Sequence, residues 1–218
     1  MTVPPFTQSP PAPPVSGDDA GTISFFTEQV RRHAGTPAAV DWGSRAGQEL
    51  RFRVLAEVGL RSGCSVLDVG CGQGDLLGWL RGQGLEVAYT GVDITPAMVE
   101  HARRHHSGAA FHLLSDGAAD LGDRAYDFVL ASGIFYRRST DPMGFLAATA
   151  ARLFRAARVA AAFNCLSLWG GPAEAGEFKA DPLAVLAACR AVSPHLALRH
   201  DYHGGDFTLY LRRERLGA

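Results

Sequence analysis

The stretch that decides the fold is VLDVGCGQGDL, residues 66–76. It begins with an apolar run of the kind that a buried parallel strand requires. Glycines then stand at the alternate positions 70, 72 and 74, and the residues after them have apolar side chains at helical spacing. Glycines let the backbone approach a ligand closely, and a helix presents free N–H groups at its first turn. The stretch therefore predicts a strand, a glycine turn and a helix that together bind a nucleotide.

Asp75 separates two classes of ligand that use such a turn. In the dinucleotide fingerprint G-x-G-x-x-G, the pyrophosphate lies on the helix N-terminus. This chain has Asp75 where that fingerprint has its third glycine, and a carboxylate there would repel a pyrophosphate. The stretch instead resembles motif I of class I S-adenosylmethionine-dependent methyltransferases, in the order Asp68, Gly70, Gly72 and Gly74.

The composition is that of one globular domain without a general affinity for nucleic acid. The chain has 218 residues, of which 47% are hydrophobic, and its formal net charge is −1. No apolar run approaches the roughly 20 residues that span a bilayer, and the first residues lack the pattern of a signal peptide. The four cysteines show no metal or disulfide spacing. We therefore expect a cytoplasmic protein with reduced thiols, no metal site and no membrane or nucleic-acid partner.

Three regions of the chain differ in composition. Residues 1–19 begin with a proline-rich run that cannot bury a core, and we expect a disordered tail there. Residues 20–60 are expected to form N-terminal cap helices, the first of them over residues 23–33. Residues 61–218 are expected to form the ligand-binding core, so that residues 20–218 make a single domain.

Cap residues near the glycine turn are candidates for the amino-acid end of S-adenosylmethionine. Ser44 is a potential N-cap of a helix that leads into the first strand, so the start of this helix is expected near the ligand. A buried carboxylate needs a guanidinium or several N–H donors. The resemblance implies this role for Arg51 on that helix, together with Trp42 and Gln48. The alternative for Trp42 is a core aromatic.

Asp93 ends the second predicted strand, about twenty residues after the glycine turn. A carboxylate at that place can accept both ribose hydroxyl protons, and GVDI resembles motif II of the methyltransferases. The alternative role, a helix N-cap before Pro96, is better filled by Thr95. Ile94 and Met98 are expected beside the cofactor, with Met98 against the adenine.

Other turns and strand ends supply further cofactor candidates. Cys71 lies in the glycine turn, where a small side chain fits. The third predicted strand is followed by Asp116 and Gly117, and the resemblance implies that Asp116 accepts a hydrogen bond from the adenine amino group; a simple Asp-Gly turn is the alternative. The carboxyl end of the fourth predicted strand, where open α/β sheets bind ligands, carries Ala131, Ser132 and Gly133.

The acceptor is expected beside the loops that follow the fourth and fifth strands. DNA and protein amide methyltransferases hold an exocyclic amine with Asn/Asp-Pro-Pro-aromatic, but this chain has Ser-Gly-Ile-Phe at that place, which excludes such substrates. Tyr136 and Arg137 are expected to line the acceptor pocket, whereas Arg138 fits a surface loop better. Asn164 is a further candidate, and the glycine-rich loop 168–181 is a candidate lid.

A general base is required if the acceptor is a hydroxyl or an acidic carbon. His200, Asp201 and His203 follow the sixth predicted strand on the ligand side, and a histidine of near-neutral pKa suits the task. His200, His203 and Tyr136 are therefore the catalytic candidates, and Asp201 is a substrate-binding candidate. The alternative for the histidines is a hairpin that polar side chains hold in place.

From about residue 40 to residue 213, the chain is similar to small stand-alone bacterial class I methyltransferases, in the segments DWGS, QELRF, VLDVGCGQGDL, GVDI, ASGIF, FNCLS and DFTLYLRR. The resemblance implies an α/β fold with a Rossmann-like seven-stranded sheet in the order 3-2-1-4-5-7-6, strand 7 antiparallel and helices on both faces. The Gly204–Gly205 link between two β-rich runs predicts the terminal hairpin of that sheet. The implied activity is methyl transfer from S-adenosylmethionine, but the resemblance does not give a substrate. Because the chain has no large cap domain, we expect a small-molecule acceptor, for example in secondary metabolism, and a monomer or homodimer.

Three other functions would use the same residues differently. Attack on another carbon of the sulfonium would give cyclisation or aminoalkyl transfer, with release of methylthioadenosine. An NAD-linked oxidoreductase is disfavoured by Asp75 and by the terminal hairpin. A catalytically silent binding module would leave Arg51 and Asp93 exposed and the pocket closed.

Overall fold

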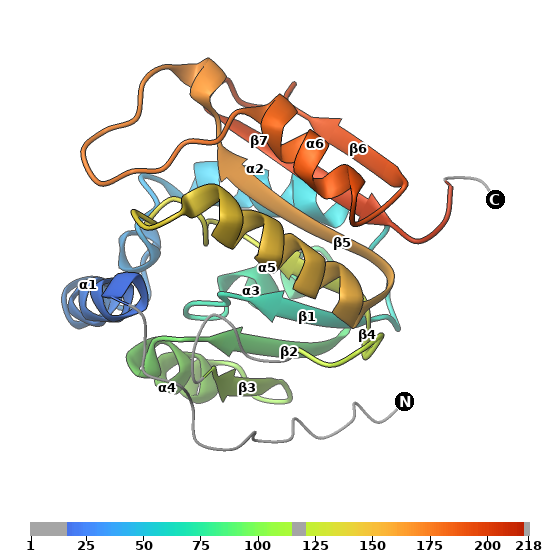
Figure 1. Ribbon diagram of the computed structural model, residues 1–218. Helices are drawn as coiled ribbons and strands as arrows, with labels where there is room; N and C mark the ends of the chain where they lie inside the picture. Colours follow the sequence, from blue (N-terminus) through green and yellow to red (C-terminus); the bar gives the residue numbers. More distant parts are fainter. Residues whose placement is uncertain (1–16, 115–120, 216–218) are drawn as a thin grey trace.

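The computed structural model describes residues 17–114 and 121–215, which form a seven-stranded sheet in the order β3-β2-β1-β4-β5-β7-β6 (Figure 1). The strands are β1 (Ser65–Val69), β2 (Ala88–Asp93), β3 (Ala110–Leu113), β4 (Tyr126–Ala131), β5 (Ala157–Leu166), β6 (His195–Arg199) and β7 (Asp206–Arg212). β7 pairs antiparallel with both β5 and β6, and the other pairings are parallel. The expected strand order and the antiparallel seventh strand are therefore confirmed.

Helices cover both faces of this sheet (Figure 1). One face carries α2 (Arg45–Ala56), α3 (Asp75–Gly82) and α4 (Pro96–His105), and the other carries α5 (Pro142–Ala156) and α6 (Pro182–Arg190). The remaining helices are α1 (Gly17–His33) and the short 3₁₀ helices η1 (Pro37–Val40) and η2 (Leu168–Gly170). Within the described ranges, no helix is long and apolar enough to cross a membrane.

Helix starts follow capping signals in the sequence. The Ser44 hydroxyl accepts a hydrogen bond from the Gly47 N–H at 3.0 Å, which begins α2 close to the glycine turn, as expected. Pro142 and Pro182 occupy the first turn of α5 and α6, where a proline costs no helical hydrogen bond. At α3 the N-cap is Gly74, which offers no side-chain cap.

α1 begins earlier than the sequence predicts. The expected cap helix spans residues 23–33, but α1 begins at Gly17, so the last three residues of the predicted tail are helical. The rest of that tail lies outside the described residues. The first turn is held because Asp18 accepts hydrogen bonds from the Ser139 hydroxyl at 2.6 Å and from the Thr140 N–H at 2.9 Å. These contacts join positions more than 120 residues apart, which local pattern does not reveal.

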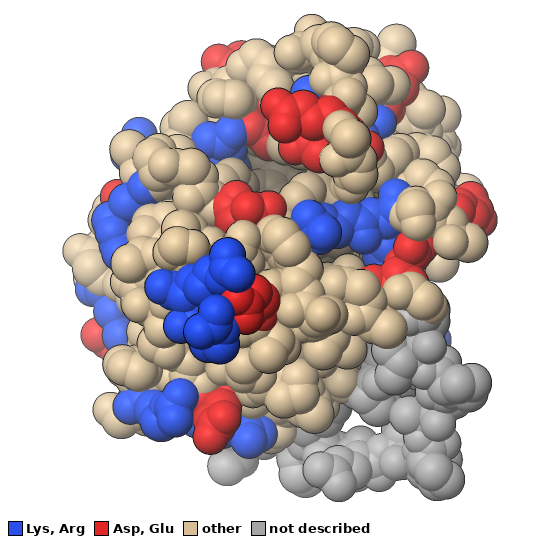
Figure 2. Space-filling view, turned by 90° about the vertical axis from the view of Figure 1, so that its left-hand side faces the viewer, with Lys and Arg blue, Asp and Glu red and all other residues tan. Residues whose placement is uncertain are grey.

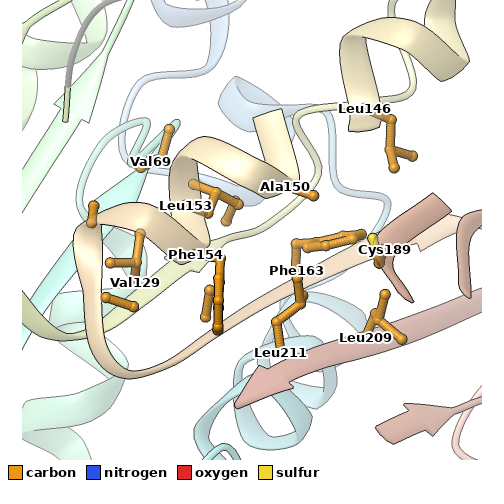
Figure 3. Close-up of a cluster of buried hydrophobic side chains, with 14 of the residues drawn as sticks. Val69, Val129, Leu146, Ala150, Leu153, Phe154, Phe163, Cys189, Leu209 and Leu211 are labelled. Carbon is orange, nitrogen blue, oxygen red and sulfur yellow. The ribbon is translucent and has the colours of Figure 1, made fainter. Parts of the chain in front are cut away.

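The apolar cluster between the sheet and the α5–α6 layer fixes the strands that lead to the cavity (Figure 3). Leu146, Ala150 and Leu153 of α5 and Phe163 of β5 are all 0% exposed. Leu209 of β7 joins them from the neighbouring strand. Because β5 is clamped between α5 and β7, its carboxyl end has a fixed position relative to β4.

Leu153→Ala should lower the free energy of unfolding by about 2–5 kcal/mol, because this α5 side chain is wholly buried against the sheet. Leu183 of α6 is 60% exposed, so Leu183→Ala is the matched control. We expect it to change the free energy of unfolding by less than about 0.5 kcal/mol. Urea denaturation followed by circular dichroism measures both. Equal losses from the two substitutions would contradict this packing of α5.

Candidate cofactor and acceptor site

The turn between β1 and α3 has a backbone conformation that glycine adopts most readily. The φ angle is +76° at Gly70, +53° at Gly72 and +85° at Gly74, in the left-handed region that disfavours side chains. A Cβ atom at Gly72 would lie 2.7 Å from Cγ1 of Val40, and one at Gly74 would lie 2.7 Å from Cδ2 of His106. Both backbone conformation and packing therefore require these glycines.

Hydrogen bonds hold this turn against the end of β2. The N–H groups of Gly70 and Cys71 both donate to the carbonyl of Val92, at 2.8 and 3.0 Å. The N–H of Gly72 donates to Oδ2 of Asp93 at 2.9 Å. The turn and the Asp93 carboxylate are thus fixed relative to each other before any ligand binds.

The Asp93 carboxylate, which lines a cavity, accepts hydrogen bonds from its neighbours. Its Oδ1 accepts a hydrogen bond from the Thr95 N–H at 2.8 Å. A carboxylate has about four lone-pair sites; the N–H groups of Gly72 and Thr95 occupy two of them, and the Thr95 hydroxyl and the Ile94 N–H also lie close enough to stabilise the charge. Burial raises the pKa of Asp93, but the N–H donors of Thr95 and Gly72 oppose that shift. These donors stabilise the ionised form, which is the form that can accept two hydroxyl protons.

A cavity of about 320 Å³ lies at the carboxyl ends of β1, β2, β4 and β5. Figure 2 shows a hollow in the face of the molecule that lies on the left in Figure 1. The sequence-predicted site residues that line the cavity are Trp42, Gln48, Asp68, Gly70, Cys71, Gly72, Asp93, Ile94, Met98, Ser132, Gly133, Tyr136, Arg137 and Asn164. One cavity therefore brings together side chains that the sequence separates by more than 120 positions.

Among the described residues, the predicted cofactor residues Gly74 and Ala131 are not in this wall. Gly74 is the N-cap of α3 and packs against His106, and Ala131 is fully buried within the sheet. Asp116 and Gly117 lie outside the described residues. All four cysteines are free and buried, and no group of three or more metal-ligating side chains is found within the described ranges.

Arg51 does not line the cavity, contrary to its expected role at the cofactor carboxylate. Its Nη2 forms a buried ion pair with Asp206, and its Nη1 donates to the Gly47 carbonyl at 2.9 Å. The two partners of the ion pair are 155 positions apart, so the pattern of α2 alone could not reveal it. Asp206, which the sequence analysis did not select, lines the cavity at the start of β7.

Trp42 and Gln48 reach the cavity as expected. Nε2 of Gln48 donates to Oδ2 of Asp75 at 3.1 Å. The Trp42 ring lies over Gly133, where an added Cβ would be 3.4 Å from Cζ2 of the indole. The guanidinium carbon of Arg51 lies 5.2 Å from the centroid of the same ring. Arg51 thus supports the cavity wall through Trp42 instead of forming part of it.

Asp68 lies in the cavity floor beside the glycine turn. Its Oδ2 accepts a hydrogen bond from the Tyr89 hydroxyl at 2.5 Å, and only 3% of the residue is exposed. Burial raises the pKa of Asp68 to about 7; the Tyr89 hydrogen bond opposes this shift, and the charge of Asp93 adds to it. The Asp68 carboxyl therefore titrates near neutral pH.

Asn164 orders the loop after β4. Its Oδ1 accepts a hydrogen bond from the Gly133 N–H at 2.8 Å, and its Nδ2 donates to Oγ of Ser132 at 3.2 Å. Asn164 is 2% exposed and still lines the cavity. It both forms part of the wall and fixes two of the expected cofactor contacts.

The loop after β4 joins the cap to the sheet. The Tyr136 hydroxyl donates to Oδ2 of Asp41 at 2.6 Å, and both residues line the cavity. Asp41 ends η1 with a φ angle of +60°, a left-handed conformation that is uncommon for a residue other than glycine. Arg138, expected in a surface loop, instead forms a buried ion pair with Asp19 of α1. The sequence alone did not indicate either of these long-range partners.

His200, Asp201 and His203 do not line the cavity, so the structure does not support the catalytic and substrate-binding roles that the sequence analysis gave them. Nε2 of His200 lies 2.7 Å from Oγ of Ser167, and Nδ1 of His203 lies 2.9 Å from Oδ2 of Asp206. The physical reason is the strand order, because β6 lies four positions from β1 at about 4.8 Å per strand. These residues follow the expected ends of the strands, and His203 contacts the wall residue Asp206 without lining the cavity itself.

Several wall residues were not singled out by the sequence analysis, although Glu177 belongs to the loop 168–181 that was expected as a lid. Thr22 and Phe26 come from α1, and Glu177 comes from the loop between η2 and α6. Phe26 was visible only as one apolar position of the expected cap helix. The place of Thr22 and Phe26 in the wall depends on how α1 docks, which is a tertiary property.

This sheet order, the glycine turn and the acid at the end of β2 together define an S-adenosylmethionine-dependent methyltransferase fold. Magnesium protoporphyrin IX methyltransferase (ChlM) from Synechocystis PCC 6803, solved with bound S-adenosylmethionine, is similar with a TM-score of 0.65 at 16% identity, over 93% of this chain and 100% of that chain. The [4+2]-cyclase SpnF is similar with a TM-score of 0.67 at 15% identity, over 93% and 98%. At such identities the likeness shows the fold.

Sequence relatives identify the family. A family profile described as a methyltransferase domain matches residues 66–157. The Mycobacterium tuberculosis protein Rv1506c, which its name describes as a methyltransferase, is 36% identical over 156 residues, 68% of this chain and 93% of that protein. A tRNA U34 carboxymethyltransferase of Aeromonas salmonicida is 39% identical over 93 residues, 40% of this chain and 28% of that protein. The chain belongs to the class I S-adenosylmethionine-dependent methyltransferases, as the motifs indicated, and its cofactor is S-adenosylmethionine.

The residues of the cavity fit this cofactor. The Asp93 carboxylate lines the cavity and is of the chemical type that binds a ribose diol, and the adjacent side chains of Ile94 and Met98 offer apolar surface for an adenine. Gln48 and Trp42 are available at the side of the cavity where α2 begins. These contacts remain predictions about the bound state.

Asp93→Asn should weaken the binding of S-adenosylhomocysteine by about tenfold or more, because one hydrogen bond to a charged group contributes about 1.5–3 kcal/mol. An asparagine NH₂ group would also face the N–H of Gly72 or Thr95, which cannot accept. The matched control is Asp127→Asn, because Asp127 lies near the start of β4, at the ends of the strands away from the cavity. There its carboxylate accepts a hydrogen bond from the Ser65 N–H. Calorimetric titration measures both; equal affinities for the two variants would contradict the assigned pocket.

Asp68 should make the protein less stable as the pH rises from about 4 to about 7. Its carboxyl ionises near pH 3.9 in an unfolded chain but with a pKa of about 7 in the folded state. Over this interval, the folded state holds a proton that the unfolded state has lost, so the contribution of Asp68 to the free energy of unfolding falls and then levels off above about pH 7.

The measurement for Asp68 is the difference in free energy of unfolding between the unchanged protein and Asp68→Asn, obtained by urea denaturation across this pH range. We expect that difference to fall steadily with rising pH. A difference that stays constant above about pH 5 would mean that the carboxyl has an ordinary pKa.

Proposed function

We propose that this methyltransferase acts on a small-molecule acceptor, for example in secondary metabolism. The observation that carries the proposal is that the cap bounds one side of the cavity. Thr22 and Phe26 of α1 form part of its wall, and the buried Asp19–Arg138 ion pair ties α1 to the loop after β4. An acceptor must fit between the cap and the strand ends, which favours a molecule of limited size.

Catalysis by such a site rests mainly on alignment and on exclusion of water. When bound, S-adenosylmethionine supplies a methyl group on a positively charged sulfur. Correct alignment of two reactants can supply about 7–11 kcal/mol of the barrier reduction. In this chain, Asp93 and the loop ordered by Asn164 would hold the cofactor, while Trp42 and Phe26 would keep water from the reacting atoms.

Tyr136 and Asp41 are the proposed proton-handling pair for a hydroxyl acceptor. No histidine of the described residues lines the cavity. The wall side chains that can take up or release a proton are therefore the acids and the Tyr136 phenol. Burial and the hydrogen bond to Asp41 raise the pKa of Tyr136, so the phenol stays protonated near neutral pH. Within this pair, the Asp41 carboxylate is therefore the base, and Tyr136 orients it.

A tRNA acceptor is the second candidate, because tRNA U34 carboxymethyltransferases are among the relatives of this chain. The chain spans less than a third of the first of these enzymes. A polyanionic backbone is bound by clustered Lys and Arg, whereas the formal net charge here is −1. Figure 2 shows acidic and basic side chains mixed around the hollow. We therefore favour the small acceptor.

We further infer that the protein works in the cytoplasm as a monomer or homodimer. Its four cysteines are free thiols, as a reducing compartment maintains them. Non-methyl chemistry on the sulfonium remains the alternative reaction, because the same contacts would hold the sulfur in either case. The two reactions differ in their products.

Incubation with methyl-labelled S-adenosylmethionine and a cell extract separated into small molecules, RNA and protein should label the small-molecule fraction and release S-adenosylhomocysteine. Asp93→Asn should reduce the labelling by about tenfold or more at limiting cofactor, as its lost hydrogen bond implies. Chromatography with scintillation counting gives the readout. Label in the RNA fraction would contradict the acceptor class, and methylthioadenosine as product would contradict methyl transfer.

A further inference from the structure

Two neighbouring arginines in the loop after β4 have different partners. Arg138 forms a buried ion pair with Asp19, and its guanidinium carbon lies 3.8 Å from the centroid of the Phe145 ring. Arg137 also lines the cavity, but no carboxylate of the described residues pairs with it. The charge of Arg138 is neutralised within the protein, whereas that of Arg137 is available to a ligand.

We propose that the acceptor is a flat, largely apolar molecule that carries an oxyanion, and that Arg137 binds this oxyanion. The proposal rests on the proposed methyl transfer to a small acceptor and specifies the chemical class of that acceptor. The oxyanion is a carboxylate or a phosphate monoester, because both offer two oxygens to a planar guanidinium.

The position of Arg137 suits such an anion. Its guanidinium carbon lies 3.7 Å from the centroid of the Phe25 ring, a distance at which the flat faces of the two groups meet. Stacking uses the face of the guanidinium, and the N–H groups at its edge lie beside the Tyr136 hydroxyl, a neutral partner that does not cancel the charge. The Phe25 ring of α1 therefore fixes the orientation of the Arg137 guanidinium before a ligand binds. Binding of an anion then costs little side-chain entropy.

The walls beside Arg137 suit a flat apolar body. Phe26 of α1, Tyr136 of the loop and Phe145 of α5 all line the cavity. Aromatic side chains bind flat rings by stacking or edge contacts worth about 0.5–1.5 kcal/mol each beyond burial. An aromatic or similarly planar acceptor would therefore use these rings while its charged end meets Arg137.

The acids of the cavity restrict where a negative group can bind. Asp41 accepts from Tyr136, Oε2 of Glu177 accepts from the Glu174 N–H at 3.1 Å, and Asp206 pairs with Arg51. Each of these carboxylates repels an oxyanion placed beside it. A charged acceptor therefore has one favourable orientation, with its oxyanion at Arg137, and this would direct the opposite end toward the cofactor.

The test uses the full-length protein saturated with S-adenosylhomocysteine and four probes of one shape: benzoate, phenyl phosphate, benzamide and benzylamine. Ligand-observed NMR titration gives the dissociation constants. We expect benzoate or phenyl phosphate to bind at least about tenfold more tightly than benzamide, and benzylamine to bind most weakly. The tighter of the two anions identifies whether a carboxylate or a phosphate is preferred.

Arg137→Gln should reduce the affinity for both anions to that for benzamide, and Arg137→Lys should restore only part of it, because an ammonium lacks the planar fork. Arg53→Gln is the control, since Arg53 is an exposed arginine of α2 outside the cavity wall. It should leave all four dissociation constants unchanged.

Three outcomes would overturn the proposal: equal binding of benzoate, phenyl phosphate and benzamide; tighter binding of benzylamine; or no binding of either anion while S-adenosylhomocysteine binds normally. If Arg137→Gln still binds the anions more tightly than benzamide, Arg137 is not the residue that binds the oxyanion. If S-adenosylhomocysteine itself does not bind, the result contradicts the proposed function on which the acceptor class rests, and not the acceptor class alone.

Discussion

The hydrogen bond from the Gly72 N–H to the Asp93 carboxylate is the contact on which the site depends. It joins the turn after β1 to the end of β2, and it exists only because Gly72 has a φ angle of +53° and no side chain. The same bond keeps one oxygen of Asp93 oriented while Thr95 orients the other. The acid that is best placed for a ribose diol is therefore held by the backbone of the turn that the cofactor approaches.

A second set of contacts holds the cap helices against one side of the cavity. α1 and η1 are not part of the sheet, and their position depends on contacts such as Asp19–Arg138 and Asp41–Tyr136. These pairs connect the cap to one short loop after β4, and that loop is in turn ordered by Asn164 of β5. The loop after β4 therefore carries residues that are expected to contact the cofactor and residues that are expected to contact the acceptor.

Several of the residues expected to hold the cofactor come together in one cavity because their signals are local. A strand, a glycine turn and an acid at the next strand end lie within 28 residues, from Val66 to Asp93, and the ladder between β1 and β2 brings them together. The fold followed from the same motifs and from the terminal hairpin. The acceptor half was predictable only in part, since Tyr136 and Arg137 follow a strand end directly.

Some of the expected site residues do not line the cavity, for reasons of tertiary structure. Arg51 was assigned from the position of its helix, but its partner Asp206 lies 155 positions away. His200 and His203 lie at the expected ends of the strands, but they follow β6, which is an edge strand of the sheet. No sequence pattern shows how far β6 lies from β1 in the sheet. Asp41 was missed because its partner Tyr136 is supplied by a distant loop.

The most direct test of the central claim is the pairing of Asp93 with the ribose diol. Affinities of S-adenosylhomocysteine and its 2′,3′-dideoxy analogue should be measured by calorimetry for the unchanged protein and for Asp93→Asn. We predict that loss of the diol weakens binding at least about tenfold in the unchanged protein and hardly at all in the variant, because the two changes remove the same hydrogen bonds. Equal discrimination by both proteins would place the ribose elsewhere and contradict the account.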